Sequence, residues 1–366
     1  MDRIVTSAGQ TVRAAARTAV FVLEVLPTLP SKPVDWITPT PVVEQARYRT
    51  RDGEAVADLY RPGSAGPHPG MLVCLGVVPL GEDHPQVKRL GNALARAGFV
   101  ALLHWSPTMR DLRLAPEDVE NLAMAYAWLL DHPAVDPERS GMIGTCVGGA
   151  FALMAAADPA IRDRVRFVGA WAPYASTRDL LHDVAAATRT RDGRREPWPV
   201  DQLTRKVFVH SLTGDLPPAD ADRLRAACAE PGGRVDATEL TPAGRAVLPL
   251  LTACDEEAAT RALDALPPAL LARLEDMSPV RYVHDIRAPL IQIIHDRDDP
   301  VIPLGESQRL AAALADRPGA QYIVFTMFKH LDPARAHLAP LALARELARF
   351  SRAMYHLVRA STRRRG

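Results

Sequence analysis

Cys146 is the residue of this chain best suited to covalent chemistry, and it stands in the run Gly144-Thr145-Cys146-Val147-Gly148-Gly149. An apolar segment, 140–145, precedes it and an Ala-rich segment, 147–157, follows it, so a strand and then a helix are predicted on its two sides. A nucleophile on such a sharp turn needs small residues two positions before and two after it, and both positions are glycine. The alternative interpretation is a small buried cysteine in a glycine-rich turn. The strand-to-helix context favours a nucleophile elbow.

An acid and a base follow along the chain in the order that such a nucleophile requires. Three aspartates, Asp296, Asp298 and Asp299, follow the apolar segment 288–294, and Asp299 directly precedes the turn Pro300-Val301-Ile302-Pro303. Asp299 is therefore our choice for the acid, with its two neighbours as solvated loop residues or alternative acids. His330 comes soon after the last predicted strand, 320–326, and is our choice for the base.

In this triad a Cys146 thiolate attacks, His330 moves the proton and Asp299 orients the imidazole. The helix that begins after Cys146 would stabilise a thiolate and, through the amide of Val147, an oxyanion. A second oxyanion amide is expected from the loop after the first buried strand, at Val77 or Val78.

The segment 104–110 follows another buried strand, and we expect it to line the mouth of the site. It offers Trp105 and Arg110 as substrate-binding residues, and Arg110 could hold a substrate carboxylate. The alternative for Arg110 is a solvated loop arginine.

The elements that must position these residues alternate between strand and helix patterns. Asp52-Gly53 joins two alternating segments, as in a hairpin. Short apolar runs predict buried strands, and amphipathic or Ala-rich stretches predict helices between them: strands at 71–76, 99–105, 140–145, 165–171, 288–296 and 320–326, and helices at 85–97, 116–131, 147–157, 305–316 and from 333. This alternation predicts an α/β fold with a doubly wound, mostly parallel sheet. Residues 176–280 interrupt it with helical segments and no clear strand, which predicts an inserted helical cap over the carboxyl ends of the strands.

Three parts of the sequence carry a resemblance to a known family. "VDPERSGMIGTCVGGAFALMAAA", "APLIQIIHDRDDPVIPLGES" and His330 are similar to the dienelactone hydrolase-like branch of the α/β hydrolases. The resemblance covers roughly 44–175 and 281–350. It implies the α/β-hydrolase fold and hydrolysis of a carboxylic ester or lactone through an acyl-cysteine. The long interval from Cys146 to Asp299 departs from compact members of that branch, so their lactone substrate does not carry over.

An acyl-transfer function is the alternative to hydrolysis. Polyester synthases and bile-acid acyltransferases also resemble this Cys, Asp and His arrangement, which makes an acyltransferase or thioesterase acting on an acyl thioester the second hypothesis. A non-catalytic binding protein is a third, disfavoured by a complete triad in order.

Composition narrows the partners. With 44 basic and 43 acidic residues the net charge is +1, which gives no basic surface for nucleic acid. No phosphate-binding glycine loop and no His/Cys cluster at metal spacing appear, so we expect no cofactor and no metal. Four scattered cysteines predict free thiols and a cytoplasmic location. The expected partner is a small ester, lactone or thioester, and the sequence leaves the oligomeric state open.

The amino-terminal region, 1–43, is predicted as a helix followed by an extended, proline-rich lead-in to a core at 44–175 and 281–366. Residues 11–27 carry Arg13 and Arg17 ahead of a short apolar run that contains Glu24. We interpret this segment as an amphipathic helix resting on the core. The alternatives are a helix in peripheral contact with a membrane surface and a signal peptide.

Overall fold

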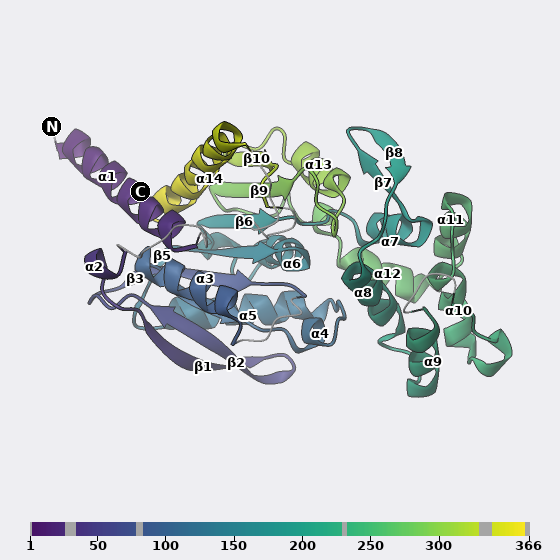
Figure 1. Cartoon of the computed structure of the whole chain (residues 1–366). Coiled ribbons are helices and arrows are strands. Elements are labelled where there is room, and N and C mark those ends of the chain that lie inside the picture. The colour runs from purple at the N-terminus through teal and green to yellow at the C-terminus, as the bar shows by residue number, and fades with distance from the viewer. Residues whose placement is uncertain (1, 26–33, 78–82, 229–232, 329–338, 363–366) are drawn as a thin grey trace.

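The computed structural model describes residues 2–25, 34–77, 83–228, 233–328 and 339–362. Its centre is an eight-stranded sheet in the order β1-β2-β4-β3-β5-β6-β9-β10 (Figure 1). The strands are β1 (Val42–Thr50), β2 (Gly53–Arg61), β3 (His68–Cys74), β4 (Val100–His104), β5 (Val135–Thr145), β6 (Phe167–Trp171), β9 (Leu290–Asp296) and β10 (Ala320–Phe325). The hairpin β1–β2 is antiparallel and joins β4 antiparallel, and the other neighbouring pairs are parallel. The predicted α/β, mostly parallel fold is confirmed.

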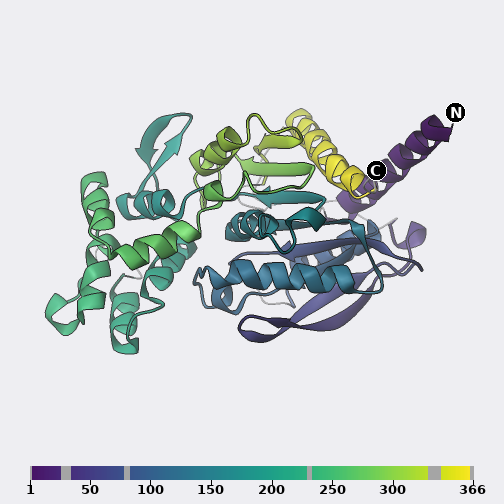
Figure 2. The same ribbon diagram turned by 180° about the vertical axis from the view of Figure 1, so that it is seen from behind.

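Helices cover both faces of this sheet because the central strands are apolar on both sides. Along β3, Leu72 and Cys74 belong to the core beneath α5 (Glu117–Asp131) and α6 (Val147–Ala156). Met71 and Val73, in the alternate positions, belong to the core beneath α3 (Pro85–Arg96) and α14 (Pro340–Ala360). Figures 1 and 2 show these two helical layers from opposite sides.

The chain leaves the sheet after β6 and returns at β9. The elements between them are α7 (Thr177–Ala186), β7 (Thr188–Arg191), β8 (Arg194–Pro197), α8 (Gln202–Thr213), α9 (Pro218–Cys228), α10 (Pro242–Leu251), α11 (Glu256–Asp264) and α12 (Pro268–Asp276). We call this segment, 177–276, the insert. It lies beyond the ends toward which the parallel strands point (Figure 1). The last strand is followed by α14, and α13 (Leu304–Ala313) packs beside β9.

The antiparallel hairpin β7–β8 was not predicted, since the insert was expected to be helical. Its strands, Thr-Arg-Thr-Arg and Arg-Arg-Glu-Pro, have no apolar face, so they lack the alternating pattern by which strands are found. The turn between them is Asp192-Gly193, and both residues have positive φ, of 48° and 77°. An Asp-Gly pair is a strong hairpin signal and could have revealed this turn.

The amino-terminal helix α1 (Asp2–Val25) begins earlier than the predicted helix and packs along α3 and α14. Ala14 and Phe21 are buried in that contact, while Val12 is exposed. The lead-in predicted as extended contains one helical turn, α2 (Val34–Ile37). Burial of Val34 and the bond from the Thr38 hydroxyl to the Val34 carbonyl account for this turn. None of the helices in the described part combines the length and apolarity needed to span a bilayer.

Candidate active site

Cys146 occupies a backbone conformation that few residues other than glycine adopt. It lies between the end of β5 and the first residue of α6, with φ 55° and ψ −133°. A non-glycine residue at positive φ stores strain, and such strain concentrates at functional sites. The Cys146 amide donates to the Trp171 carbonyl oxygen at 2.7 Å, which fixes the turn against the end of β6. The turn places the cysteine where the carboxyl edge of the sheet meets a helix N-terminus.

The glycines on either side of the elbow are required by close backbone contact. A Cβ on Gly144 would lie 2.2 Å from the Gly148 carbonyl oxygen. A Cβ on Gly148 would lie 2.4 Å from the Cys74 carbonyl oxygen and 2.5 Å from the Gly76 amide nitrogen. Real Cβ atoms do not approach this closely, so both positions exclude every other residue.

The loop after β3 packs directly on the elbow. Gly76 has φ +73°, and a Cβ there would lie 2.7 Å from the Thr145 carbonyl oxygen. The Thr145 hydroxyl donates to the Leu75 carbonyl at 2.8 Å, which ties the loop to the elbow. Val77, one of the two expected oxyanion residues of this loop, is buried beside Cys146 and Val147. Val78 lies outside the described residues.

The three aspartates at the end of β9 and in the loop after it have different surroundings. Asp299 is 1% exposed, and its Oδ1 accepts from the amides of Val301 at 2.8 Å and Ile302 at 3.0 Å. Asp298 pairs with Arg191 at the surface at 3.1 Å. A buried carboxylate held by two amides is suited to orient a base, and a solvated carboxylate in an ion pair is not.

Both carboxylate oxygens of Asp296 accept hydrogen bonds from backbone amides. Its Oδ1 accepts from the Asp298 amide at 3.0 Å and its Oδ2 from the Phe328 amide at 2.7 Å. The second bond fixes the chain two residues before His330. His330 itself lies outside the described residues, so its pairing with Cys146 and Asp299 stays a prediction.

The other three cysteines lack the setting of Cys146. Cys74 is fully buried, and desolvation raises the pKa of its thiol to about 12. Desolvation also raises the pKa of the Cys228 thiol. Cys254 is exposed, and all four thiols are free. Among the described residues, no group of three or more metal-ligating side chains comes together.

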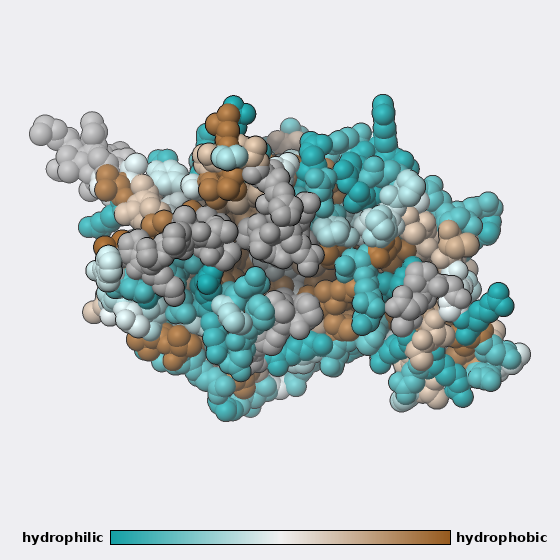
Figure 3. Space-filling model, viewed as in Figure 1, coloured by the Kyte–Doolittle hydropathy of each residue, from teal (hydrophilic) through white to brown (hydrophobic). Residues whose placement is uncertain are grey.

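An apolar pocket opens on Cys146 between the sheet and the insert. Its empty space is about 620 Å³, part of it open to solvent. The core contributes Val77, Leu114, Cys146, Val147, Val301 and Ile302, and the insert side contributes Thr177, Leu180, Leu181, Val184, Leu203, Thr204, Val207, Phe208, Ser211, Leu274 and Met277. Figure 3 shows hydrophobic surface along this junction on the face seen in Figure 1. Cys146 therefore borders an apolar space that is partly open to solvent.

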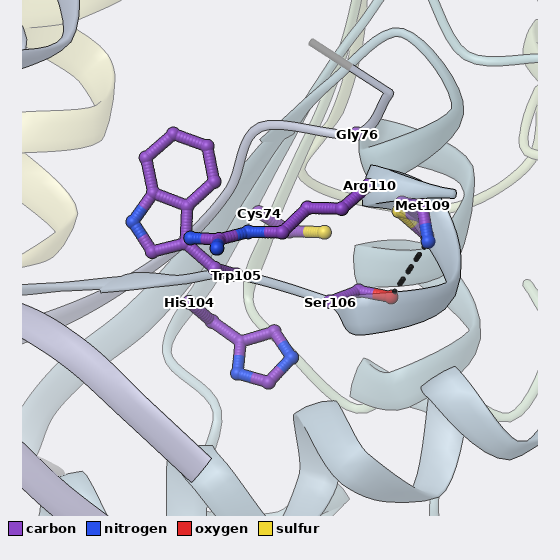
Figure 4. Close-up of a pocket in the computed structure, with 7 residues that line it drawn as sticks. All are labelled: Cys74, Gly76, His104, Trp105, Ser106, Met109 and Arg110. Atoms are coloured by element: carbon purple, nitrogen blue, oxygen red, sulfur yellow. Dashed lines mark hydrogen bonds between the residues drawn. The ribbon is translucent and has the colours of Figure 1, made fainter. Parts of the chain in front are cut away.

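Trp105 and Arg110 lie elsewhere, in a small recess that Cys146 does not line. The guanidinium of Arg110 lies 5.0 Å from the centre of the Trp105 ring, and Figure 4 shows the Arg110 side chain extending toward that ring. His104 lies below them, and its Nδ1 is 2.6 Å from the Tyr48 hydroxyl. Desolvation lowers the pKa of His104 to about 4, so this imidazole is neutral at pH 7. The structure therefore brings the two predicted binding residues together without placing them in the pocket of the cysteine.

Residues of the insert hold the loop that carries Asp299, which the sequence did not indicate. Arg189 of β7 donates to the Asp299 carbonyl at 3.4 Å, and the Trp198 indole donates to the Pro300 carbonyl at 3.1 Å. The hydroxyl of Thr204 donates to the Val301 carbonyl at 3.3 Å. Three consecutive carbonyls of the acid loop are thus bound from the insert. No local sequence pattern predicts such a hydrogen bond, because its two partners are about a hundred residues apart along the chain.

Comparison with known proteins gives one relative by sequence and many by fold. No family model matches the chain. The chain is 33% identical over 193 residues to a protein of Bradyrhizobium sp. named a probable 2-oxo-3-(5-oxofuran-2-ylidene)propanoate lactonase, covering 45% of this chain and 76% of that protein.

Two solved structures illustrate the fold. A 2,6-dihydroxy-pseudo-oxynicotine hydrolase superposes with a TM-score of 0.53 at 16% identity, over 87% of this chain and 68% of that chain. The acylaminoacyl peptidase of Pyrococcus horikoshii superposes with a TM-score of 0.54 at 15% identity. The superposition covers 87% of this chain and 42% of the peptidase chain. At these identities the likeness concerns the arrangement of strands and helices alone.

Proposed function

The chain belongs to the carboxylic ester and lactone hydrolases of the α/β-hydrolase family, and we propose that it acts through an acyl-cysteine formed on Cys146. The observation that carries the proposal is the positive-φ elbow of Cys146, which sits at the N-terminus of α6 and lines the apolar pocket. The lactonase relative agrees with the dienelactone hydrolase-like branch suggested by the sequence motifs.

In the first half of the reaction the Cys146 thiolate attacks the substrate carbonyl carbon. The carbonyl oxygen becomes an oxyanion, bound by the amide of Val147 and by an amide of the loop at Val77 or Val78. The amides in the first turn of a helix have no partner within the helix, so the amide of Val147 is suited to this contact. His330 protonates the departing alcohol oxygen, and the bond from carbon to that oxygen breaks.

In the second half, a water molecule attacks the thioester carbonyl carbon. His330 takes a proton from this water as it attacks. The tetrahedral intermediate releases the Cys146 thiolate and the carboxylic acid. Asp299 keeps the imidazole oriented through both steps. Positions 176–280 are proposed to act as a cap that covers the acyl-enzyme.

The test combines mutation with detection of the acyl group. Cys146→Ala should abolish hydrolysis of p-nitrophenyl esters, and Cys146→Ser should retain weak activity, because the site is arranged for a thiolate. Brief exposure of the wild type to substrate should add one acyl mass to the peptide that contains Cys146. Labelling of Cys146 with iodoacetamide should be measured in a Cys254→Ser variant, because the free thiol of Cys254 is exposed. Full activity in Cys146→Ala would overturn the proposal.

Acyl transfer is the second candidate. The observation that favours it is the apolar lining of the pocket, since exclusion of water lengthens the life of an acyl-enzyme. Adding a thiol or alcohol acceptor during ester turnover distinguishes the two reactions. A transferase should make the acylated acceptor at the expense of the free acid, whereas a hydrolase should make the acid at an unchanged rate.

A further inference from the structure

The pocket that Cys146 lines differs in chemical character from the recess of Trp105 and Arg110. None of the described residues that line the pocket is charged. The recess holds the charged side chain of Arg110 and the polar groups of His104, Trp105 and Ser106. The loop after β3 separates the two spaces, with Gly76 lining the recess and Val77 lining the pocket.

Each of the three hydroxyls among the described lining residues makes a hydrogen bond within the protein. The hydroxyl of Thr177 donates to the Met277 carbonyl at 2.9 Å, and that of Thr204 to the Val301 carbonyl. The Ser211 hydroxyl accepts from the Leu114 amide at 3.0 Å. A carboxylate placed here would lose its water and gain no cation from the described lining residues, which is strongly unfavourable. A hydrocarbon chain would gain from leaving water.

Resting on the proposed function, we infer that this pocket holds the acyl half of the substrate, and that the acyl group is an uncharged, largely hydrocarbon chain. The pocket begins at the reacting carbonyl, because both Val77 and Val147 of the proposed oxyanion site line it. The acyl group stays bound to sulfur through both halves of the reaction, whereas the alcohol must leave after the first. The space under α7, α8 and α12 therefore suits the part that stays.

This substrate class differs from that of the lactonase relative, whose name specifies a propanoate. In this chain α7, α8 and α12 supply most of the described lining of the pocket.

The first experiment is a series of p-nitrophenyl esters whose acyl groups run from acetate through hexanoate to dodecanoate. We expect kcat/KM to rise by up to roughly fourfold for each methylene buried, until the pocket is filled. The p-nitrophenyl monoester of suberic acid matches the octanoate ester in length but ends in a carboxylate. Its kcat/KM should be at least about tenfold lower than that of the octanoate.

A substitution in the lining tests where the chain lies. Val207 of α8 is half-buried and lines the pocket, and Lys206 precedes it on the same helix without lining it. Val207→Trp should move the optimum to shorter acyl chains and lower the ratio of kcat/KM for the dodecanoate ester to that for the hexanoate ester. Lys206→Trp should keep the wild-type profile. If Val207→Trp fails to fold, the acyl series and the suberate comparison on the wild type still test whether the pocket holds an uncharged acyl chain.

The outcomes separate this inference from the proposed function. If no ester is turned over and Cys146 carries no acyl group, both fail. If Cys146-dependent turnover is flat with acyl length, or favours the suberate ester, the apolar acyl pocket is wrong and the acyl-cysteine stands. Esters of acetic acid with alcohols from ethanol to octanol form the last arm. A strong dependence on alcohol length would assign the pocket to the leaving group and overturn the inference.

Discussion

At the scale of single residues, the three neighbouring aspartates show how position alone separates similar side chains. Asp299 is buried and held by two amides, Asp296 bonds to the backbone before His330, and Asp298 pairs with a surface arginine. Asp299 and Asp296 are both buried and bonded to backbone amides, and Asp298 is not, so the place of Asp299 directly before Pro300 keeps it as our choice for the acid.

Asp299→Asn should lower kcat by up to about 10⁴, by analogy with the serine triad, because the amide no longer stabilises the imidazolium. Asp298→Asn is the matched control and should stay near wild type. Asp296→Asn should destabilise the fold through its lost carboxylate contacts. Measurement of kcat and of thermal unfolding on all three variants separates these effects. An active Asp299→Asn beside a folded but inactive Asp296→Asn would move the acid to Asp296.

At the scale of elements, the hairpin β7–β8 and the start of α8 are joined to the acid loop. The Trp198 side chain follows β8, is 2% exposed and donates to the Pro300 carbonyl. The insert therefore contacts the loop of Asp299, the proposed acid, as well as forming a wall of the pocket. Its removal would free the loop of Asp299, so a trimmed core would lose activity and selectivity together.

Trp198→Phe keeps the aromatic ring in place and removes this one bond. We assign Trp198 as a positioning residue and expect kcat to fall roughly fivefold with KM little changed, a loss of about 1 kcal/mol in transition-state stabilisation. Trp36→Phe is the control, because Trp36 is 88% exposed on α2. Steady-state kinetics with a short ester, together with circular dichroism, provide the measurement. If kcat is unchanged while stability falls, Trp198 is structural only.

At the scale of the whole molecule, the chain passes from the sheet to the insert near residue 175 and returns near residue 278. Hydrogen bonds join these two segments to each other and to the core. The Tyr174 hydroxyl donates to the Met277 carbonyl at 2.8 Å, and the Val280 amide donates to the Ala175 carbonyl. Glu306 of α13 accepts from the amides of Ala175 and Ser176. Desolvation raises the pKa of this fully buried carboxyl to about 7, with Arg309 and the two amides opposing the shift and Asp183 adding to it.

Because the folded chain keeps the Glu306 proton up to about pH 7 and the unfolded chain releases it near 4.5, this group lowers the free energy of unfolding as pH rises between these values. The loss is on the order of 3 kcal/mol. Glu306→Gln, which still offers an oxygen to the Ala175 amide, should remove this part of the pH dependence. Urea unfolding at pH 5, 6 and 8 measures it, with the exposed Glu275→Gln as control. Parallel curves for wild type and Glu306→Gln would contradict the assignment.

The sequence by itself determined the frame of this protein. Apolar runs and the helices between them predicted the parallel sheet, since burial on both faces requires strands without a polar side. Gly144 and Gly148 predicted the elbow of Cys146, because close backbone contact depends on residue size and is visible in a short run of sequence.

Tertiary structure alone decided what surrounds that elbow. The polar hairpin β7–β8 escaped prediction because its strands bury no apolar face. The apolar pocket, the separate recess of Trp105 and Arg110 and the hold of the insert on the Asp299 loop also depended on the folded chain. Each arises where segments that are distant along the chain meet, and the side chains that line such a junction are chosen by packing across it, which leaves no periodic mark along the chain.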